Sequence, residues 1–105
     1  MHNYVFAYHG GKSFETKEQG TQHMTDWIAW STGLKEALID PGMPVGQSKT
    51  VEASGVTDNG GANPLTGITI VQADSIDAAI EMAKTCPHID NGGTIEVAQA
   101  LPMDM

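Results

Sequence analysis

The hydrophobic pattern of this chain switches between two periods, and the order of the switches restricts the fold more than any other feature. β-Forming residues alternate over residues 3–9, and from about Gln22 apolar residues recur every three or four positions, as in an amphipathic helix. Thr21 is the expected N-cap of this helix, and Asp40-Pro41-Gly42 is expected to end it. The chain is therefore predicted to begin with a strand followed by a long helix.

The rest of the chain contains three more strand patterns and one more helix. The strands are expected over 48–54, 65–73 and 94–100. A Gly- and Asn-rich stretch over 55–64 is expected to be a long loop. The second helix is expected to be capped by Asp74 and to end at Pro87.

The predicted order of elements is β-α-β-β-α-β. This order is typical of an α+β protein with a ferredoxin-like fold, in which both helices cover one face of a four-stranded antiparallel sheet. The sequence has 105 residues and shows no internal repeat or linker. We expect a single domain over 1–105, with 101–105 as a loose tail.

The strands carry apolar residues on both sides, although helices can cover only one of them. In the first strand Tyr4, Phe6 and Tyr8 alternate with Val5 and Ala7, and the later strands repeat the pattern. A sheet with one solvated face would alternate apolar and polar residues more cleanly. We therefore expect a homodimer packed sheet to sheet, with the three aromatic residues in the dimer face rather than around a cofactor.

The charge of the chain argues against two classes of partner. Five Lys and Arg against 13 Asp and Glu give a formal net charge of −8. Nucleic acids and anionic membranes are bound through clusters of Lys and Arg, so neither is an expected partner. The sequence has no apolar run of the ~20 residues that span a bilayer and no signal-peptide core. Its one cysteine has no intramolecular partner, and we expect a cytoplasmic protein.

His23 is the first candidate for chemistry. Trp27 and Trp30 follow it by four and seven residues, so all three share one side of the predicted helix. An imidazole beside two indoles could act as general acid or base in an aromatic pocket; the alternative is a half-exposed histidine beside core tryptophans. Asp40 could orient His23, but Asp-Pro-Gly is also ordinary turn chemistry. About one helix length, at ~1.5 Å per residue, separates the two, so contact needs the loop to fold back or a partner subunit.

Five other residues are candidates for metal binding or for a nucleophile. His9 and His88 could point into the same cleft, and His2 and Asp90 add further metal ligands. The chain has no HExxH or CxxC pair and no GxGxxG or GxxxxGK[ST] loop, so we expect no metal and no cofactor. Cys86 is expected to be structural, because it falls at the C-terminal end of the second predicted helix, where the dipole disfavours a thiolate.

Several weak motifs in a fixed order give the chain a family resemblance. The segment GITIVQADSIDAAIEMAKTCPHIDNGGTIEVAQA (67–100) resembles the C-terminal half of YCII-related proteins. The N-terminal half is similar as well, with an aromatic first strand, a helix carrying a histidine, Asp40-Pro41-Gly42 and a Ser-Lys-Thr-Val strand over 48–51. The resemblance covers nearly the whole chain and implies a dimeric α+β barrel, in which two ferredoxin-like subunits pack through their sheets.

The resemblance also implies a site. The family's proposed site pairs a histidine on the first helix, here His23, with an aspartate; Cys86-Pro87 stands where many members have Asp-Pro, which leaves Asp40 as the nearest substitute. We expect a small-molecule enzyme without a cofactor, isomerase- or lyase-like, with its pocket between the first helix and the sheet. The expected substrate-binding residues are Trp27, Trp30, Tyr8 and His9. The alternative is a non-catalytic ligand-binding or regulatory interaction module acting as a homodimer.

Overall fold

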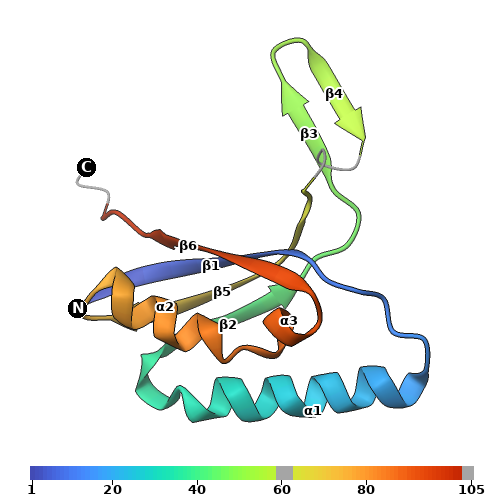
Figure 1. Ribbon diagram of the computed structural model, residues 1–105. Coiled ribbons are helices and arrows are strands. Elements are labelled where there is room, and N and C mark those ends of the chain that lie inside the picture. Colours follow the sequence, from blue (N-terminus) through green and yellow to red (C-terminus); the bar gives the residue numbers. More distant parts are fainter. Residues whose placement is uncertain (59–62, 103–105) are drawn as a thin grey trace.

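Four strands form the main sheet of the computed structural model, which describes residues 1–58 and 63–102. The sheet is antiparallel and has the order β2-β5-β1-β6, so the strands nearest the chain ends, β1 and β6, are neighbours (Figure 1). Its strands are β1 (His2–Gly10), β2 (Leu38–Pro44), β5 (Leu65–Ala73) and β6 (Gly93–Gln99). The architecture is α+β and compatible with a ferredoxin-like arrangement.

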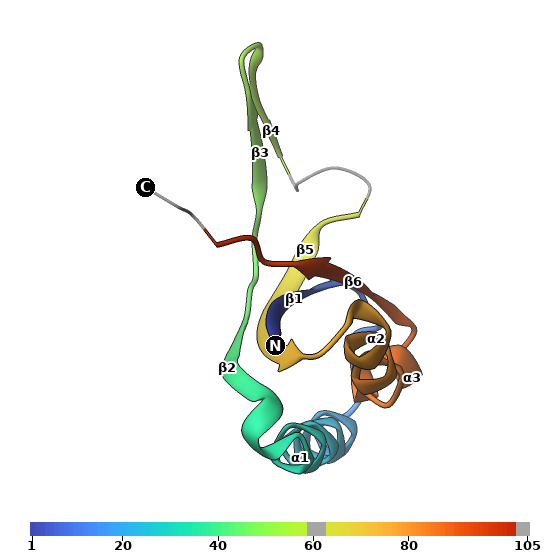
Figure 2. The ribbon, with the colours of Figure 1, turned by 90° about the vertical axis from the view of Figure 1, so that its left-hand side faces the viewer.

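The helices lie together on one side of this sheet (Figures 1 and 2). They are α1 (Lys17–Gly33), the short 3-10 turn η1 (Lys35–Ala37), α2 (Ile76–Lys84) and α3 (Pro87–Asp90). Among the described residues, none of these helices is long and apolar enough to cross a membrane.

The core lies between the sheet and the helices, and it contains the aromatic side of β1. Tyr4, Phe6 and Tyr8 are all buried there with Val71 and Ala79. The expectation that the three aromatic residues belong to a dimer face is therefore wrong. The residues of β1 alternate as predicted, but the prediction assigned the aromatic side to the wrong face of the sheet. The aromatic side chains bury the largest apolar area, so they face the helices of their own chain.

The first helix begins earlier and ends earlier than predicted. Thr16, not Thr21, is the N-cap, and its Oγ1 accepts a hydrogen bond from the amide of Gln19 at 3.1 Å. The Thr21 hydroxyl instead donates to the carbonyl of Lys17 inside the helix. The helix ends at Gly33, and Lys35, with a φ of 55°, turns the chain into the edge strand β2.

The segment predicted as a turn, Asp40-Pro41-Gly42, lies within β2. Proline is tolerated there because β2 is the edge strand of the sheet. Gly42 has a φ of 70°, and a Cβ at this position would overlap the backbone carbonyl of Ile68. The strand is irregular around these residues, which hides it from a search for alternating hydrophobicity.

The strand predicted over 48–54 exists but belongs to a different sheet. β3 (Lys49–Glu52) pairs only with β4 (Gly55–Asp58), and this hairpin projects from the side of the main sheet opposite the helices (Figures 1 and 2). The hairpin is an insertion into the predicted β-α-β-β-α-β order. β4 falls within the predicted loop over 55–64, of which 59–62 lie outside the described residues.

The remaining predictions differ from the structure by a few residues. The strand over 65–73 has the predicted bounds. Ser75 rather than Asp74 caps α2, since its side chain accepts a hydrogen bond from the amide of Ala78. α3 begins at Pro87, and proline is tolerated there because the first amide of a helix has no carbonyl partner within the helix. Most of the predicted tail, residues 103–105, lies outside the described residues.

Candidate functional site

A cavity of about 500 Å³ lies between α1 and the main sheet. α1 supplies one wall, β2 and β5 supply the opposite wall, and the segment after β1 closes one end together with α3. Most of its lining side chains are apolar or aromatic. Its principal side chains are Tyr8, Phe14, His23, Met24, Trp27, Ile28, Met43 and His88.

His23 lies on the α1 wall of this cavity between two aromatic rings. The imidazole centroid is 5.0 Å from that of Phe14 and 5.7 Å from that of Trp27. The side chain is partly buried, so its ring contacts both the aromatic cluster and open space. The predicted pairing of His23 with Trp27 on one helix face is confirmed by these contacts.

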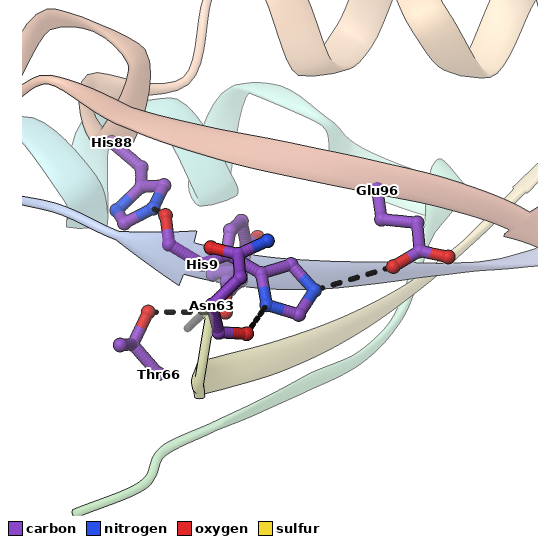
Figure 3. A network of polar contacts seen from close by, with 6 residues as sticks. His9, Asn63, Thr66, His88 and Glu96 are labelled. Carbon is purple, nitrogen blue, oxygen red and sulfur yellow. Dashed lines mark hydrogen bonds and ion pairs between the residues drawn. The ribbon is translucent and has the colours of Figure 1, made fainter. Parts of the chain in front are cut away.

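His88 enters the same cavity from α3. Its Nε2 lies 2.9 Å from the backbone carbonyl oxygen of His9, which accepts the Nε2 hydrogen (Figure 3). The ring is edge-on to Tyr8 at 5.3 Å and to Trp27 at 6.4 Å between centroids. Both imidazoles of the site therefore pack against the indole of Trp27.

The imidazole of His88 occupies a slot made by two glycines. A Cβ at Gly93 would overlap the ring, and one at Gly11 would lie 3.1 Å from its Cε1 atom. Within the described chain, every fully buried side-chain nitrogen or oxygen has a hydrogen-bond partner, and the Nδ1 of His88 has none there. Nδ1 is therefore not fully enclosed, and His88 lines the cavity.

The phenol of Tyr8 forms the floor of the site and is held by a chain of hydrogen bonds. Its hydroxyl donates to Oγ1 of Thr69 at 2.7 Å, and Thr69 donates in turn to the carbonyl of Pro41 at 3.1 Å. Burial raises the pKa of Tyr8 well above its ordinary value, and Thr69 only partly offsets this. The phenol is therefore a neutral, oriented wall group at physiological pH.

The structure does not bring all of the predicted site residues to the cavity. Trp30 faces the core, where its ring stacks on Phe6 at 6.4 Å and its Nε1 donates to the carbonyl of Met82 at 3.1 Å. Asp40 is exposed, and its Oδ1 accepts a hydrogen bond from the amide of Gly42 at 2.8 Å. The chain does fold back, since Pro41 and Gly42 line the cavity, but the carboxylate of Asp40 is not among the lining groups.

His9 lies on the other side of β1 from the cavity. Its Nδ1 is 3.0 Å from the carbonyl oxygen of Asn63, and its Nε2 is 3.2 Å from Oε1 of Glu96 (Figure 3). Only the backbone of His9 serves the site, by accepting the hydrogen bond from His88. The alternation of side chains along a strand explains this, because Tyr8 and His9 are consecutive residues and point to opposite faces.

Cys86 is buried beside the site without facing it. Burial raises the pKa of its thiol to about 11, although a hydrogen bond from the backbone of His88 acts in the opposite direction. The thiol is therefore protonated at neutral pH, which agrees with the structural role expected for it. Within residues 1–58 and 63–102, no group of three or more His, Cys, Asp or Glu side chains is arranged to hold a metal ion.

Two parts of the site do not stand out in the sequence. The segment after β1 contributes Lys12 and Phe14 to the cavity, although it carries no recognisable motif. Gly11 and Gly93 leave space for His88, a packing role that only the structure shows. The Cys-Pro-His order could have indicated that a new helical turn begins at Pro87, since proline is favoured at the first position of a helix.

Comparison with known proteins assigns the chain to a family. A search of curated proteins finds no matching sequence. The family model of the YCII-related domain matches residues 1–104, which is nearly the whole chain. The chain with this aromatic, histidine-lined cavity belongs to the YCII-related family.

Proposed function

We propose that the cavity binds a small organic molecule and that His23 transfers a proton to or from it. The observation that carries this proposal is the position of His23 on the wall of a 500 Å³ cavity whose other walls are mainly apolar. A cavity of this size matches the range of small-molecule sites, ~300–1,000 Å³. Imidazole is the side chain best suited to proton transfer near neutral pH.

The walls favour a reaction that needs only positioning and proton movement. Trp27 and Phe14 flank His23, and Tyr8 offers a neutral phenol on the floor. An apolar site that excludes water strengthens every polar contact that the bound molecule makes. Proton abstraction, elimination or isomerisation is the reaction class that these groups support.

Proton transfer is testable before the natural substrate is identified. A ligand-observed NMR screen of small carbonyl compounds and organic acids selects molecules that bind, and each is then incubated with the protein in heavy water. We expect deuterium to enter an acidic C–H position of at least one bound molecule, and the rate to fall by about 10²-fold or more in His23→Ala. His2→Ala is the matched control, since His2 is exposed and lies outside the cavity. Equal exchange by wild type and His23→Ala rejects the catalytic role.

A binding function without turnover is the second candidate, and the position of Asp40 favours it. The carboxylate of Asp40 bonds to its own backbone at Gly42 rather than to His23. Among the described residues lining the cavity, no Asp or Glu is available to orient His23. This function predicts bound molecules in the screen with no His23-dependent exchange of their protons.

We also propose that the face of the sheet away from the helices packs against a second copy of the chain. Val5 pairs with Ile70 on one side and Ala98 on the other, so apolar residues adjoin across three strands. An apolar face without a covering layer favours self-association. We expect a dimer by light scattering, and a monomer for Ile70→Lys. Ile76→Lys, on α2 at the helix side of the sheet, is the control and should leave the dimer intact.

A further inference from the structure

We propose that the molecule bound in the cavity is an organic carboxylate with an apolar body, and that His88 is the residue that recognises its carboxylate group. The inference rests on the proposed function, because it assigns a ligand class and a second residue to the same cavity. Three properties of the described walls carry it: their charge, the orientation of His88 and the distribution of aromatic rings.

The charge of the walls is opposite to the charge of the chain. The sequence has 13 Asp and Glu against five Lys and Arg, yet none of the described residues lining the cavity is an Asp or Glu. Its charged or chargeable groups are Lys12, His23 and His88, together with the neutral phenol of Tyr8. A cationic ligand would meet no counter-charge there, whereas an anion would meet up to three.

Lys12 is held at the cavity by its backbone. Its amide donates to the carbonyl of Asn91 at 3.0 Å, and the Asn91 side chain donates to the carbonyl of Lys12 at 3.0 Å. Its aliphatic stem runs over Gly92, where a Cβ would lie 3.3 Å from Cε. Among the described residues, no carboxylate forms an ion pair with Lys12, so its charge is available to the cavity.

The orientation of His88 determines which of its nitrogens meets a ligand. Nε2 is committed as a donor to the carbonyl of His9, a partner that only accepts. In the neutral ring this bond fixes the proton on Nε2 and leaves Nδ1 as an acceptor; in the charged ring Nδ1 also donates. A carboxylate therefore binds Nδ1 when the ring takes up a proton, giving a charge-assisted hydrogen bond in a site of low dielectric.

The groups around His88 permit that charge. Cys86 at the start of α3 and Asp90 at its end are the titratable groups beside His88 on its own helix. The other titratable groups near the His88 ring are Tyr8 on β1, Lys12 after β1 and His23 on α1. Tyr8 and Cys86 are neutral at physiological pH because burial raises the pKa of each. The indole of Trp27 lies edge-on to the ring.

The aromatic walls define the rest of the ligand. Trp27, Phe14 and Tyr8 surround the space next to the two imidazoles, and Met24, Ile28 and Met43 extend it. An apolar or aromatic body would fill this volume while its single charged group contacts His88. We therefore expect arylacetic and similar acids to bind, with their neutral analogues binding more weakly.

Phenylacetate and phenylacetamide test the inference, because they differ in charge but hardly in shape. We expect calorimetry near neutral pH to give phenylacetate at least about tenfold higher affinity than phenylacetamide, and phenethylamine the lowest. Raising the pH should weaken the binding of phenylacetate and leave that of phenylacetamide unchanged, since only the acid needs a charged imidazole. This measurement uses the wild-type protein and does not depend on the folding of a variant.

His88→Gln assigns the preference to one residue. The glutamine amide can still donate to the carbonyl of His9, but it carries no titratable acceptor at the position of Nδ1. We expect the preference of this variant for the acid to fall at least about threefold below that of the wild type, the remainder coming from Lys12 and His23. His2→Gln is the matched control and should retain the wild-type preference for the acid.

The outcomes separate this inference from the proposed function. Equal wild-type affinity for acid and amide, or an acid preference that neither high pH nor His88→Gln reduces, overturns the carboxylate assignment while leaving a ligand-binding cavity. Failure of every molecule of the wider screen to bind overturns the proposed function as well. An acid preference that is lost in His23→Gln but kept in His88→Gln overturns the assignment to His88, because recognition then depends on His23.

Discussion

Gly93 leaves the space that the imidazole of His88 fills. A Cβ at Gly93 would overlap the ring near Nε2, the atom that donates to the carbonyl of His9. Gly93 has no positive φ, so its lack of a side chain matters for packing rather than for backbone conformation. The first residue of β6 therefore decides whether α3 can direct His88 into the site.

Gly93→Ala should destabilise the protein by about 1–3 kcal/mol, because a methyl group forced into a packed site displaces its neighbours. Urea unfolding measures the change in the free energy of unfolding. Gly33→Ala is the matched control: nothing lies within 4 Å of the added methyl group, and alanine favours the helix end, so no loss of stability is expected. The cost of Gly93→Ala should shrink in a His88→Ala background if the clash is with that ring. An undiminished cost would assign the effect to another neighbour.

Thr16→Ala should cost about 1 kcal/mol of stability, because it removes the side-chain acceptor for the amide of Gln19. Thr21→Ala removes a hydroxyl that bonds only to the carbonyl of Lys17 within the helix, and it should be neutral or slightly stabilising. Thermal unfolding of the two variants compares the observed cap with the one predicted from the sequence. A larger loss for Thr21→Ala would contradict the observed helix start.

Trp30→Phe should destabilise the protein by about 1–3 kcal/mol, because it removes the hydrogen bond to the carbonyl of Met82 and part of the ring that packs against Phe6. Thr85 donates to the same carbonyl from an exposed position, so Thr85→Val is the control and should cost less than about 0.5 kcal/mol. Urea unfolding distinguishes the two. Trp30→Phe also leaves Trp27 as the single tryptophan, and its emission should still respond to a ligand in the cavity. Loss of that response in a folded variant would contradict the core position of Trp30.

The stability of the protein should fall as the pH rises above 9. The pKa of Cys86 is 9.0 for the ordinary thiol and about 11 in the folded protein. Between these values the unfolded chain binds fewer protons than the folded one, so the stabilisation is complete below pH 9 and is lost as the pH approaches 11. Two pKa units correspond to about 2–3 kcal/mol. The raised pKa of Tyr8 acts in the same direction at higher pH.

Urea midpoints at about pH 8, 9.5 and 10.5 measure this fall. Cys86→Ala is the control, and its stability should change little between pH 9 and the pH at which unfolded tyrosine ionises, ~10. An unchanged slope in Cys86→Ala would show that the thiol is not responsible.

Regular segments of the fold could be predicted from the sequence, and irregular ones could not. The strand over 65–73 has the predicted bounds because β-branched and apolar residues fill most of it and it contains no proline. β2 was missed because Asp40-Pro41-Gly42 has the composition of a turn, and only its pairing with β5 makes it a strand. Pairing of this kind depends on residues far away in the chain.

The candidate site shows the same division. His23 and Trp27 could be placed on one wall because helical spacing alone brings them together. Trp30 shares that stretch of helix, but it points to Met82 in the core. The spacing of residues around a helix is constant, whereas the rotation of the whole helix about its axis is fixed only by the residues that it packs against.

The sequence by itself determined the α+β class, the family and the presence of His23 on an aromatic helix, because these follow from local periodicity and motif order. Only the tertiary structure decided that the aromatic side of β1 faces the helices, that Asp40 bonds its own backbone and that His88 enters the cavity through the space at Gly93. The physical reason is that strand alternation has two equivalent sides, and a turn has no fixed direction, until packing against distant residues chooses one.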